Sequence, residues 1–251
     1  MPTELAPARH LEGLRAAMTA FVRYADRAGL QAPVPTCPDW TVRDLVAHQG
    51  MVHRWAAALL RGDRDIDPDA YEAEGLLEPD PLEWLRDGVI GLVETLVRAP
   101  ADVRAPVFLP DAPAPREFWA RRQCHETSVH AVDALSAALG RRPVAAETWL
   151  TTDLAVDGID ELLGGFLTRP RSRLRCDDDA VLVVAPDDVP DWWLVQVGPG
   201  PAVTTRRTGP RADGDWVLDG SAVDLYLSLW NRTDRPALEG TWRERAAVTW
   251  T

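Results

Sequence analysis

Residues 41–60 have the sequence TVRDLVAHQGMVHRWAAALL, and the spacing of their apolar side chains predicts an amphipathic helix. Thr41 and Asp44 form a capping-box-like pair at its start, with Asp in place of the usual Glu. The stripe predicted to face inward consists of Leu45, His48, Val52, Trp55 and Leu59. His48 lies in the middle of this stripe, so its imidazole should point into the core, where a lone histidine is usually satisfied by a hydrogen bond.

Three other segments in the first half have the same three- and four-residue spacing and predict helices at 6–28, 82–96 and 116–139. Gly140 follows the last of them, as expected for a residue just past a helix end. Prolines break the chain at 33–38 and at 100–115, and residues 62–81 form an acidic stretch that we expect to be irregular. Four helices of this length predict an antiparallel four-helix bundle.

The pattern changes after Pro143. A helix is expected at 148–166, followed by strands at 173–176, 181–185, 192–197, 202–207 and 216–219 and a closing helix at 221–230. This order indicates a small α+β domain. We therefore expect two domains, an N-terminal bundle over residues 1–142 and a C-terminal α+β domain over residues 143–251.

Composition excludes several classes of protein. The 251 residues are 46% hydrophobic and 26% charged with a net charge of −12, and a chain this acidic is not expected to bind nucleic acid. No apolar run approaches membrane length, and the first residues, MPTEL, lack the basic and apolar regions of a signal peptide, so we expect no membrane association and a cytoplasmic location. All 27 basic residues are arginine, as in proteins from GC-rich genomes such as those of actinobacteria. The three cysteines are too few for a disulfide framework; Cys37 is expected in the turn before residue 41 and Cys124 as a packed thiol.

Candidate chemistry concentrates in the helix predicted at 116–139, where residues 125–130 have the sequence HETSVH. His125 and His130 are five apart, about 140° around a helix, and cannot easily bind one ion. Glu126 and His130 are four apart and share a face. With His48 from a facing helix they make a His₂Glu set that suits Zn²⁺ and leaves a fourth position open. Ni²⁺ and Fe²⁺ suit the same donors, so spacing alone leaves the metal open.

Other interpretations of these residues stay open on spacing alone. Glu126 has Arg122 four residues before it and could instead form an ordinary solvated ion pair. His53 and His125 lie off the inward stripes, as surface or packing residues do. Asp133 lies one turn beyond His130 and could either orient that imidazole or be an exposed helix aspartate.

Three segments resemble the maleylpyruvate isomerase family of mycothiol-dependent enzymes, which are DinB-like four-helix metalloproteins. They are 34–48 (VPTCPDWTVRDLVAH), 122–133 (RQCHETSVHAVD) and 219–232 (DGSAVDLYLSLWNR). In that family the metal ligands are the histidine that closes the first motif and the Glu and last His of the second. The resemblance therefore assigns His48, Glu126 and His130 as the metal ligands. Gln49 and Gly50 depart from the pattern, because relatives often have small or apolar residues there.

The resemblance implies a divalent metal, zinc being the first choice, and mycothiol as thiol cosubstrate. The metal would activate the thiol for addition to a small electrophilic substrate, which makes the chain an isomerase if the thiol leaves again or an S-transferase if it stays. It also implies that Arg232, which ends the third motif, holds a substrate carboxylate, although an arginine there also suits a helix C-terminus. Two alternatives remain: a biosynthetic tailoring enzyme that no longer uses a thiol, and a non-catalytic ligand-binding or sensor protein.

Overall fold

The computed structural model describes residues 4–234, and the chain divides into two compact units. The first consists of Leu5–Phe108 and Pro113–Pro143, and the second takes in Leu109–Ala112 and the described residues from Val144 onward. The domain boundary predicted between residues 142 and 143 stays a prediction, because a compact unit need not fold on its own. Within the described residues, none of the helices is both long and apolar enough to cross a bilayer.

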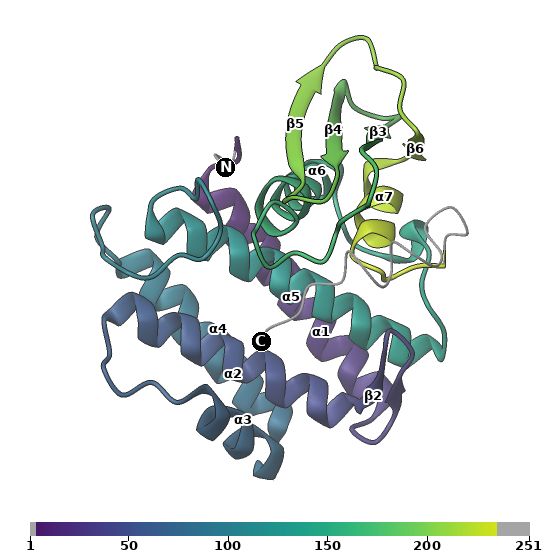
Figure 1. Ribbon diagram of the computed structural model, residues 1–251. Helices are drawn as coiled ribbons and strands as arrows, with labels where there is room; N and C mark the ends of the chain where they lie inside the picture. Colours follow the sequence, from purple (N-terminus) through teal and green to yellow (C-terminus); the bar gives the residue numbers. More distant parts are fainter. Residues whose placement is uncertain (1–3, 235–251) are drawn as a thin grey trace. The chain divides into compact units, whose positions relative to one another are not determined.

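The first unit is built on four long helices, which confirms the predicted bundle (Figure 1). They are α1 (Pro7–Ala28), α2 (Val42–Arg61), α4 (Pro81–Arg98) and α5 (Pro115–Leu139). Helix α1 packs along α5, and α2 packs along α4 and α5. Their inward faces bury a core that includes Leu14, Phe21, Leu45, Leu85 and Leu92, each without exposed surface.

Local sequence signals set the ends of the two helices that matter for the site. Thr41 caps α2 in a complete capping box, because its backbone N–H donates to Asp44 Oδ2 (2.8 Å) and its side chain accepts from the Asp44 N–H. Helix α5 ends at Gly140, whose φ of 68° is readily adopted only by glycine. Both boundaries agree with the sequence analysis, because caps are local interactions.

Two segments expected to be irregular are ordered elements. The acidic stretch contains a short helix, α3 (Pro68–Leu77), whose N-cap Asp67 accepts a hydrogen bond from the Ala70 N–H (3.2 Å). The proline-rich stretch forms a hairpin of β1 (Pro33–Val34) and β2 (Cys37–Thr41). Helix α3 buries only Gly75 and therefore lacks the apolar stripe that predicts a helix.

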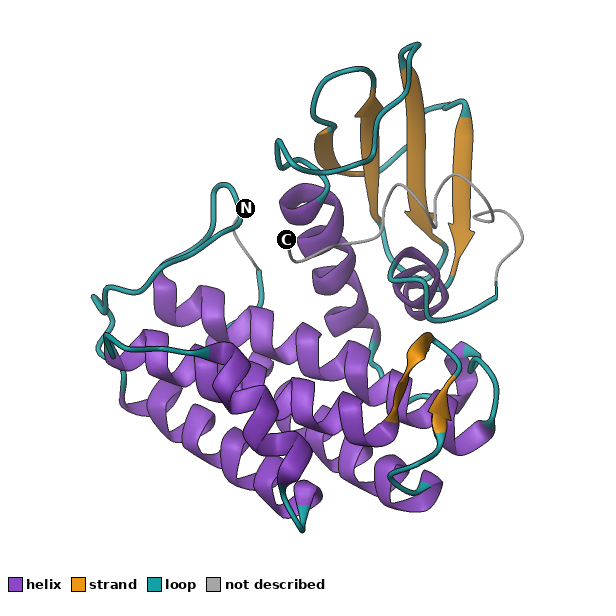
Figure 2. Ribbon diagram, turned by 60° about the horizontal axis from the view of Figure 1, so that its bottom comes forward, coloured by secondary structure: helices purple, strands orange, loops and turns teal. Residues whose placement is uncertain are grey.

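The second unit is α+β, as predicted, and its strands lie side by side in one sheet (Figure 2). The strands β3 (Ala180–Pro186), β4 (Asp191–Val197), β5 (Val203–Thr208) and β6 (Trp216–Gly220) have the order β5-β4-β3-β6. The pairs β3–β4 and β4–β5 are antiparallel, whereas β3 and β6 are parallel. The unit also contains α6 (Thr152–Asp160) and α7 (Ala222–Leu229), and the Trp193 indole of β4 donates to Asp160 Oδ1 (2.9 Å).

Two details of the second unit differ from expectation. The helix expected at 148–166 begins only at Thr152, as α6, and ends in a π-helical segment at Glu161–Phe166; a separate 3₁₀ turn at Ala145–Glu147 precedes it. The strand expected at 173–176 is irregular, and its Cys176 N–H donates to the carbonyl of Gly198 (3.1 Å), outside any strand ladder.

Candidate metal centre

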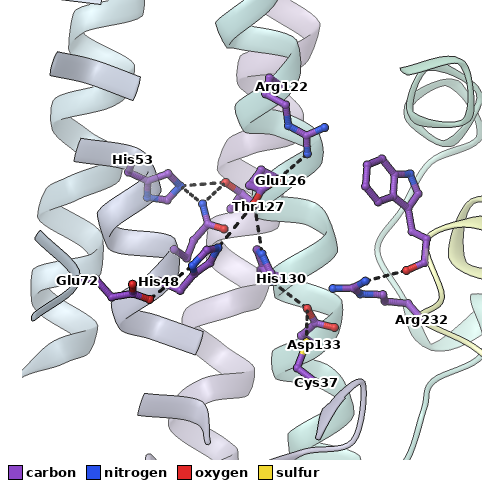
Figure 3. Close-up of polar contacts among 12 residues, drawn as sticks. Cys37, His48, His53, Glu72, Arg122, Glu126, Thr127, His130, Asp133 and Arg232 are labelled. Carbon is purple, nitrogen blue, oxygen red and sulfur yellow. Dashed lines mark hydrogen bonds and ion pairs between the residues drawn. The ribbon is translucent and has the colours of Figure 1, made fainter. Parts of the chain in front are cut away.

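Helices α2 and α5 bring His48, Glu126 and His130 together in the bundle (Figure 3). One ligand-type atom from each residue lies within 4.8 Å of the other two. Glu126 Oε1 lies 3.4 Å from His130 Nε2 and 3.9 Å from His48 Nε2. These separations approach the roughly 3.3 Å expected between ligand atoms bound at about 2.0–2.1 Å around a tetrahedral Zn²⁺. The three residues therefore have both the donor chemistry and the spacing of a metal site.

Each of the three residues has its other polar atom held by a neighbouring charged side chain (Figure 3). Arg122 Nη2 donates to Glu126 Oε2 (2.7 Å). His130 Nδ1 lies 2.9 Å from Asp133 Oδ2, and His48 Nδ1 lies 3.6 Å from Glu72 Oε1. A carboxylate beside Nδ1 favours a proton on that nitrogen and leaves the Nε2 lone pair directed at the metal position.

The electrostatics match this arrangement. Burial lowers the pKa of His48, but the Glu126 and Glu72 carboxylates outweigh it and raise that pKa to about 9. Burial also opposes ionisation of Glu126, but Arg122 and the two histidines hold its pKa well below the ordinary value. Glu126 is thus an anion, and a metal binding here would displace the proton of His48, because only neutral imidazole is a ligand.

Several sequence alternatives are decided by burial. The Arg122–Glu126 ion pair exists, but it is not the solvated pair considered above, because Arg122 is 2% exposed and Glu126 11%. Asp133 is fully buried rather than exposed. His53 and His125 are buried residues, not surface ones. Because Arg122 occupies one Glu126 oxygen and leaves the other facing the histidines, the ion pair and the ligand role are compatible.

All three cysteines lie in the described part of the chain, and none of them forms a disulfide. Cys124 is buried, as predicted for a packed thiol. Cys37 begins β2, where the sequence analysis expected a turn, and its Sγ donates to Asp133 Oδ2 at 3.6 Å. The hairpin thereby contacts the residue that holds His130.

A buried polar layer beside the three candidate ligands was missed from the sequence. Gln49 Nε2 lies 2.9 Å from His53 Nε2, and His53 Nε2 lies 2.9 Å from Thr127 Oγ1. All three side chains are fully buried, and burial, with Arg54 nearby, lowers the pKa of His53 to about 3. The sequence did contain a signal for this layer: Gln49 and His53 are four residues apart and share a face of α2, and Thr127 directly follows the candidate ligand Glu126.

Two more residues around the candidate ligands were not identified in the sequence. The centroid of the Trp40 ring lies 4.9 Å from the centroid of the His48 ring. Trp40 also stacks on His130, with 5.9 Å between the two ring centroids. Glu72 belongs to α3, a helix that the sequence analysis did not predict. Trp40 belongs to the same motif as His48, residues 34–48, and that was the available signal, whereas Glu72 had none.

Arg232 belongs to the second unit and lies three residues after the end of α7. Its Nη1 donates to the carbonyl oxygen of Trp230 (2.7 Å), the residue that caps α7. This contact is the one expected of an arginine at a helix C-terminus.

Both parts of the chain match family models. The model described as "Mycothiol maleylpyruvate isomerase N-terminal domain" matches residues 11–135, and the "MDMPI C-terminal domain" model matches residues 153–249. No curated protein sequence matches the chain.

Two solved structures resemble the chain in fold. One is a crystal structure of a His-to-Ala mutant of the mycothiol-dependent maleylpyruvate isomerase, with 14% sequence identity and a TM-score of 0.61. The other is a crystal structure of the mycothiol-dependent maleylpyruvate isomerase, with 15% identity and a TM-score of 0.56. In both comparisons 92% of this chain and 91% of the other are covered. At these identities the likeness is one of fold.

Proposed function

Because the chain belongs to the mycothiol maleylpyruvate isomerase family, a family of enzymes, we propose that it is a metal- and mycothiol-dependent isomerase or S-transferase. Its substrate is a small electrophile such as maleylpyruvate. The metal is a divalent ion, Zn²⁺ being the best match, held by His48, Glu126 and His130.

One observation carries the proposal: each candidate ligand has one donor atom facing the other two and its second polar atom held elsewhere. Here Arg122, Asp133 and Glu72 satisfy the outer atoms, and the inner atoms point toward a shared position. Three ligands leave a fourth position open for an exogenous group.

When bound, the metal lowers the pKa of the mycothiol thiol, so that the nucleophilic thiolate exists at neutral pH. The residues of this chain prepare that chemistry. Glu126 supplies one negative charge, and Arg122 keeps that carboxylate ionised and oriented. Asp133 Oδ2 lies 2.9 Å from His130 Nδ1 and is placed to hold the proton on that nitrogen. The thiolate would add to an electrophilic double bond and move its π electrons onto the conjugated carbonyl oxygen; after rotation about the resulting single bond, the return of these electrons would expel the thiolate again.

The test is elemental analysis of the purified protein combined with turnover of maleylpyruvate in the presence and absence of mycothiol. We expect about one divalent metal per chain, and turnover that needs both metal and mycothiol. The His48→Ala variant should stay folded with greatly reduced metal content, and full metal occupancy in this variant would contradict the ligand assignment. A thiol-independent reaction would indicate tailoring chemistry, and metal binding without turnover would indicate a binding protein.

Product analysis distinguishes the two activities within the proposal. An isomerase returns mycothiol unchanged after each turnover, whereas an S-transferase retains it in a thioether product. Catalytic mycothiol would therefore support the isomerase, and stoichiometric consumption would support the transferase.

We further propose that Arg232 binds a substrate carboxylate, and the resemblance of residues 219–232 to the family motif supports this role. Its contact with Trp230 supports the competing role of helix cap. If Arg232 binds substrate, Arg232→Ala should lower kcat/KM for an anionic substrate at least about tenfold, or roughly 1.4 kcal/mol. Metal content and melting temperature should be nearly unchanged. A lowered melting temperature with intact kinetics would establish the cap instead.

A further inference from the structure

Helix α3 presents one carboxylate to the candidate metal site. Glu72 Oε1 lies 3.6 Å from His48 Nδ1, and Figure 3 shows the Glu72 side chain pointing at that imidazole. Two other acidic residues of the helix do not: Asp69 is exposed in the first turn, and Glu74 accepts a hydrogen bond from the Trp84 indole (3.0 Å). The proximity to His48 is therefore a property of Glu72 and not of an acidic surface in general.

The position of Glu72 is built into the packing of α3 against α2 and α4. A Cβ atom on Gly75 would lie 2.7 Å from the Trp84 ring and 3.1 Å from Ala47 Cα, so glycine permits the close approach of α3. At the end of the helix, Arg43 Nη1 donates to the carbonyls of Leu76 and Glu78 (3.1 Å each). These contacts, all within one to two turns after Glu72, hold α3 close against α2 and α4 and so keep Glu72 near His48.

The two nitrogens of His48 face different partners. Nε2 faces Glu126 Oε1 at 3.9 Å, whereas Nδ1 faces Glu72. Because these nitrogens lie on different sides of the imidazole ring, Glu72 is not placed to join the three ligand atoms around the shared position. It is placed to accept a hydrogen bond from Nδ1–H, the role that Asp133 has for His130 at 2.9 Å.

We propose that Glu72 is a positioning residue for the metal ligand His48. It selects the tautomer that leaves Nε2 free for the metal, and it orients the ring. The inference rests on the proposed metal site and extends it to a residue 24 positions along the chain from His48, on a helix of its own. The Glu72 side chain is 37% exposed, so this contact is the one at the site that solvent reaches most readily.

The experiment compares Co²⁺ binding by wild type, Glu72→Ala and Glu72→Gln, with competing chelator and the Co²⁺ visible spectrum as the readout. Outer-sphere partners of metal-bound histidines are worth about 10–100-fold in metal affinity, so we expect Glu72→Ala to lose that much. Glu72→Gln should fall between the two, because its amide oxygen still accepts a hydrogen bond but carries no charge. The matched control is Asp69→Asn, which removes one negative charge from an exposed position of the same helix.

A second readout separates positioning from general stability. In the Zn²⁺-loaded protein the Nδ1–H proton of His48 should be visible by NMR, and its signal should shift or exchange faster in Glu72→Ala but not in Asp69→Asn. Equal Co²⁺ affinity in wild type and Glu72→Ala would overturn this inference and leave the proposed function intact. Equal losses in Glu72→Ala and Asp69→Asn would overturn it as well, because charge alone would then explain the effect. Failure of the wild type to bind Co²⁺ or Zn²⁺ would overturn the proposed function and this inference with it.

Discussion

At the scale of single residues, the site is defined by which atom of each side chain is already engaged. Glu126 Oε2 forms the ion pair with Arg122, whereas Glu126 Oε1 faces the histidines and is left available for a metal. His53 is the contrast, because it lies in the same bundle but its Nε2 is engaged by Gln49 and Thr127. A histidine engaged in this way is a structural residue, and its protonation should cost stability.

The pH dependence of stability tests that view of His53. Its pKa is lowered to about 3 in the folded protein and lies near 6.5 in an unfolded chain, so the unfolded state binds more protons between these values. Stability from His53 is therefore present above pH 6.5 and is lost as the pH falls, with a limiting slope of about 1.4 kcal/mol per pH unit. We expect urea titrations of metal-free protein between pH 6.5 and 4.5 to show a steeper loss in wild type than in His53→Gln.

The His53→Gln variant is the appropriate comparison, because the carboxylates titrate in the same pH range in wild type and variant and their effects cancel. Parallel pH profiles for wild type and His53→Gln below pH 6.5 would show that His53 is not buried in its neutral form.

His48 affects stability in a different pH range. Its raised pKa stabilises the metal-free fold below pH 6.5, and that contribution is lost as the pH rises toward 9.

At the scale of elements, one tryptophan joins three helices. The Trp84 ring of α4 lies against Gly50 of α2 and Gly75 of α3, and the Arg54 guanidinium carbon lies 3.6 Å from the ring centroid. The departure from the family pattern at Gly50 thus has a packing role, because a Cβ there would come within 2.0 Å of the ring. This contact also explains how the weakly apolar α3 is held.

Substitutions at two glycines should have opposite effects. Gly50→Ala forces Trp84 to move, and we expect a loss of roughly 1–3 kcal/mol in the free energy of unfolding, as for other overpacked cores. Gly91→Ala on the exposed face of α4 meets no atom within 4 Å and should instead stabilise the protein by roughly 0.5–1 kcal/mol, because alanine favours helix. Denaturant titration measures both, and equal stability in the two variants would mean that Trp84 does not fill this contact.

At the scale of the whole molecule, the proposed metal site would couple metal binding to folding, because His48 comes from α2 while Glu126 and His130 come from α5. An unfolded chain does not hold these atoms together, so a metal that binds only the folded state stabilises it. The three candidate ligands come together only after folding has brought α2 and α5 side by side.

Thermal unfolding should therefore respond to added metal. Zn²⁺ at a free concentration 100 times its dissociation constant should add about 2.7 kcal/mol to the free energy of unfolding and raise the melting temperature. Calorimetry with and without chelator measures the shift. His48→Ala should melt at the same temperature in both conditions, and a shift of wild-type size in that variant would place the metal elsewhere on the chain.

The sequence by itself determined the features that depend on neighbours along the chain. Apolar spacing predicted the four long helices, capping chemistry predicted the start of α2 at Thr41, and Gly140 predicted the end of α5. The four-residue interval between Glu126 and His130 placed both on one helix face, and the structure brings both to His48. These predictions succeeded because helix periodicity and caps act over a few residues.

Only the tertiary structure decided which partners surround those side chains. Helix α3 has too little apolar surface to be predicted, and it is held by Trp84 and Arg43 from other helices. Glu72 therefore reaches His48 through packing alone. In the same way, only the structure shows that the Arg122–Glu126 pair is buried in the site rather than exposed at the surface. Only the structure shows that His53 contacts Thr127. Contacts between distant segments depend on how helices pack, and spacing along one helix carries no information about that.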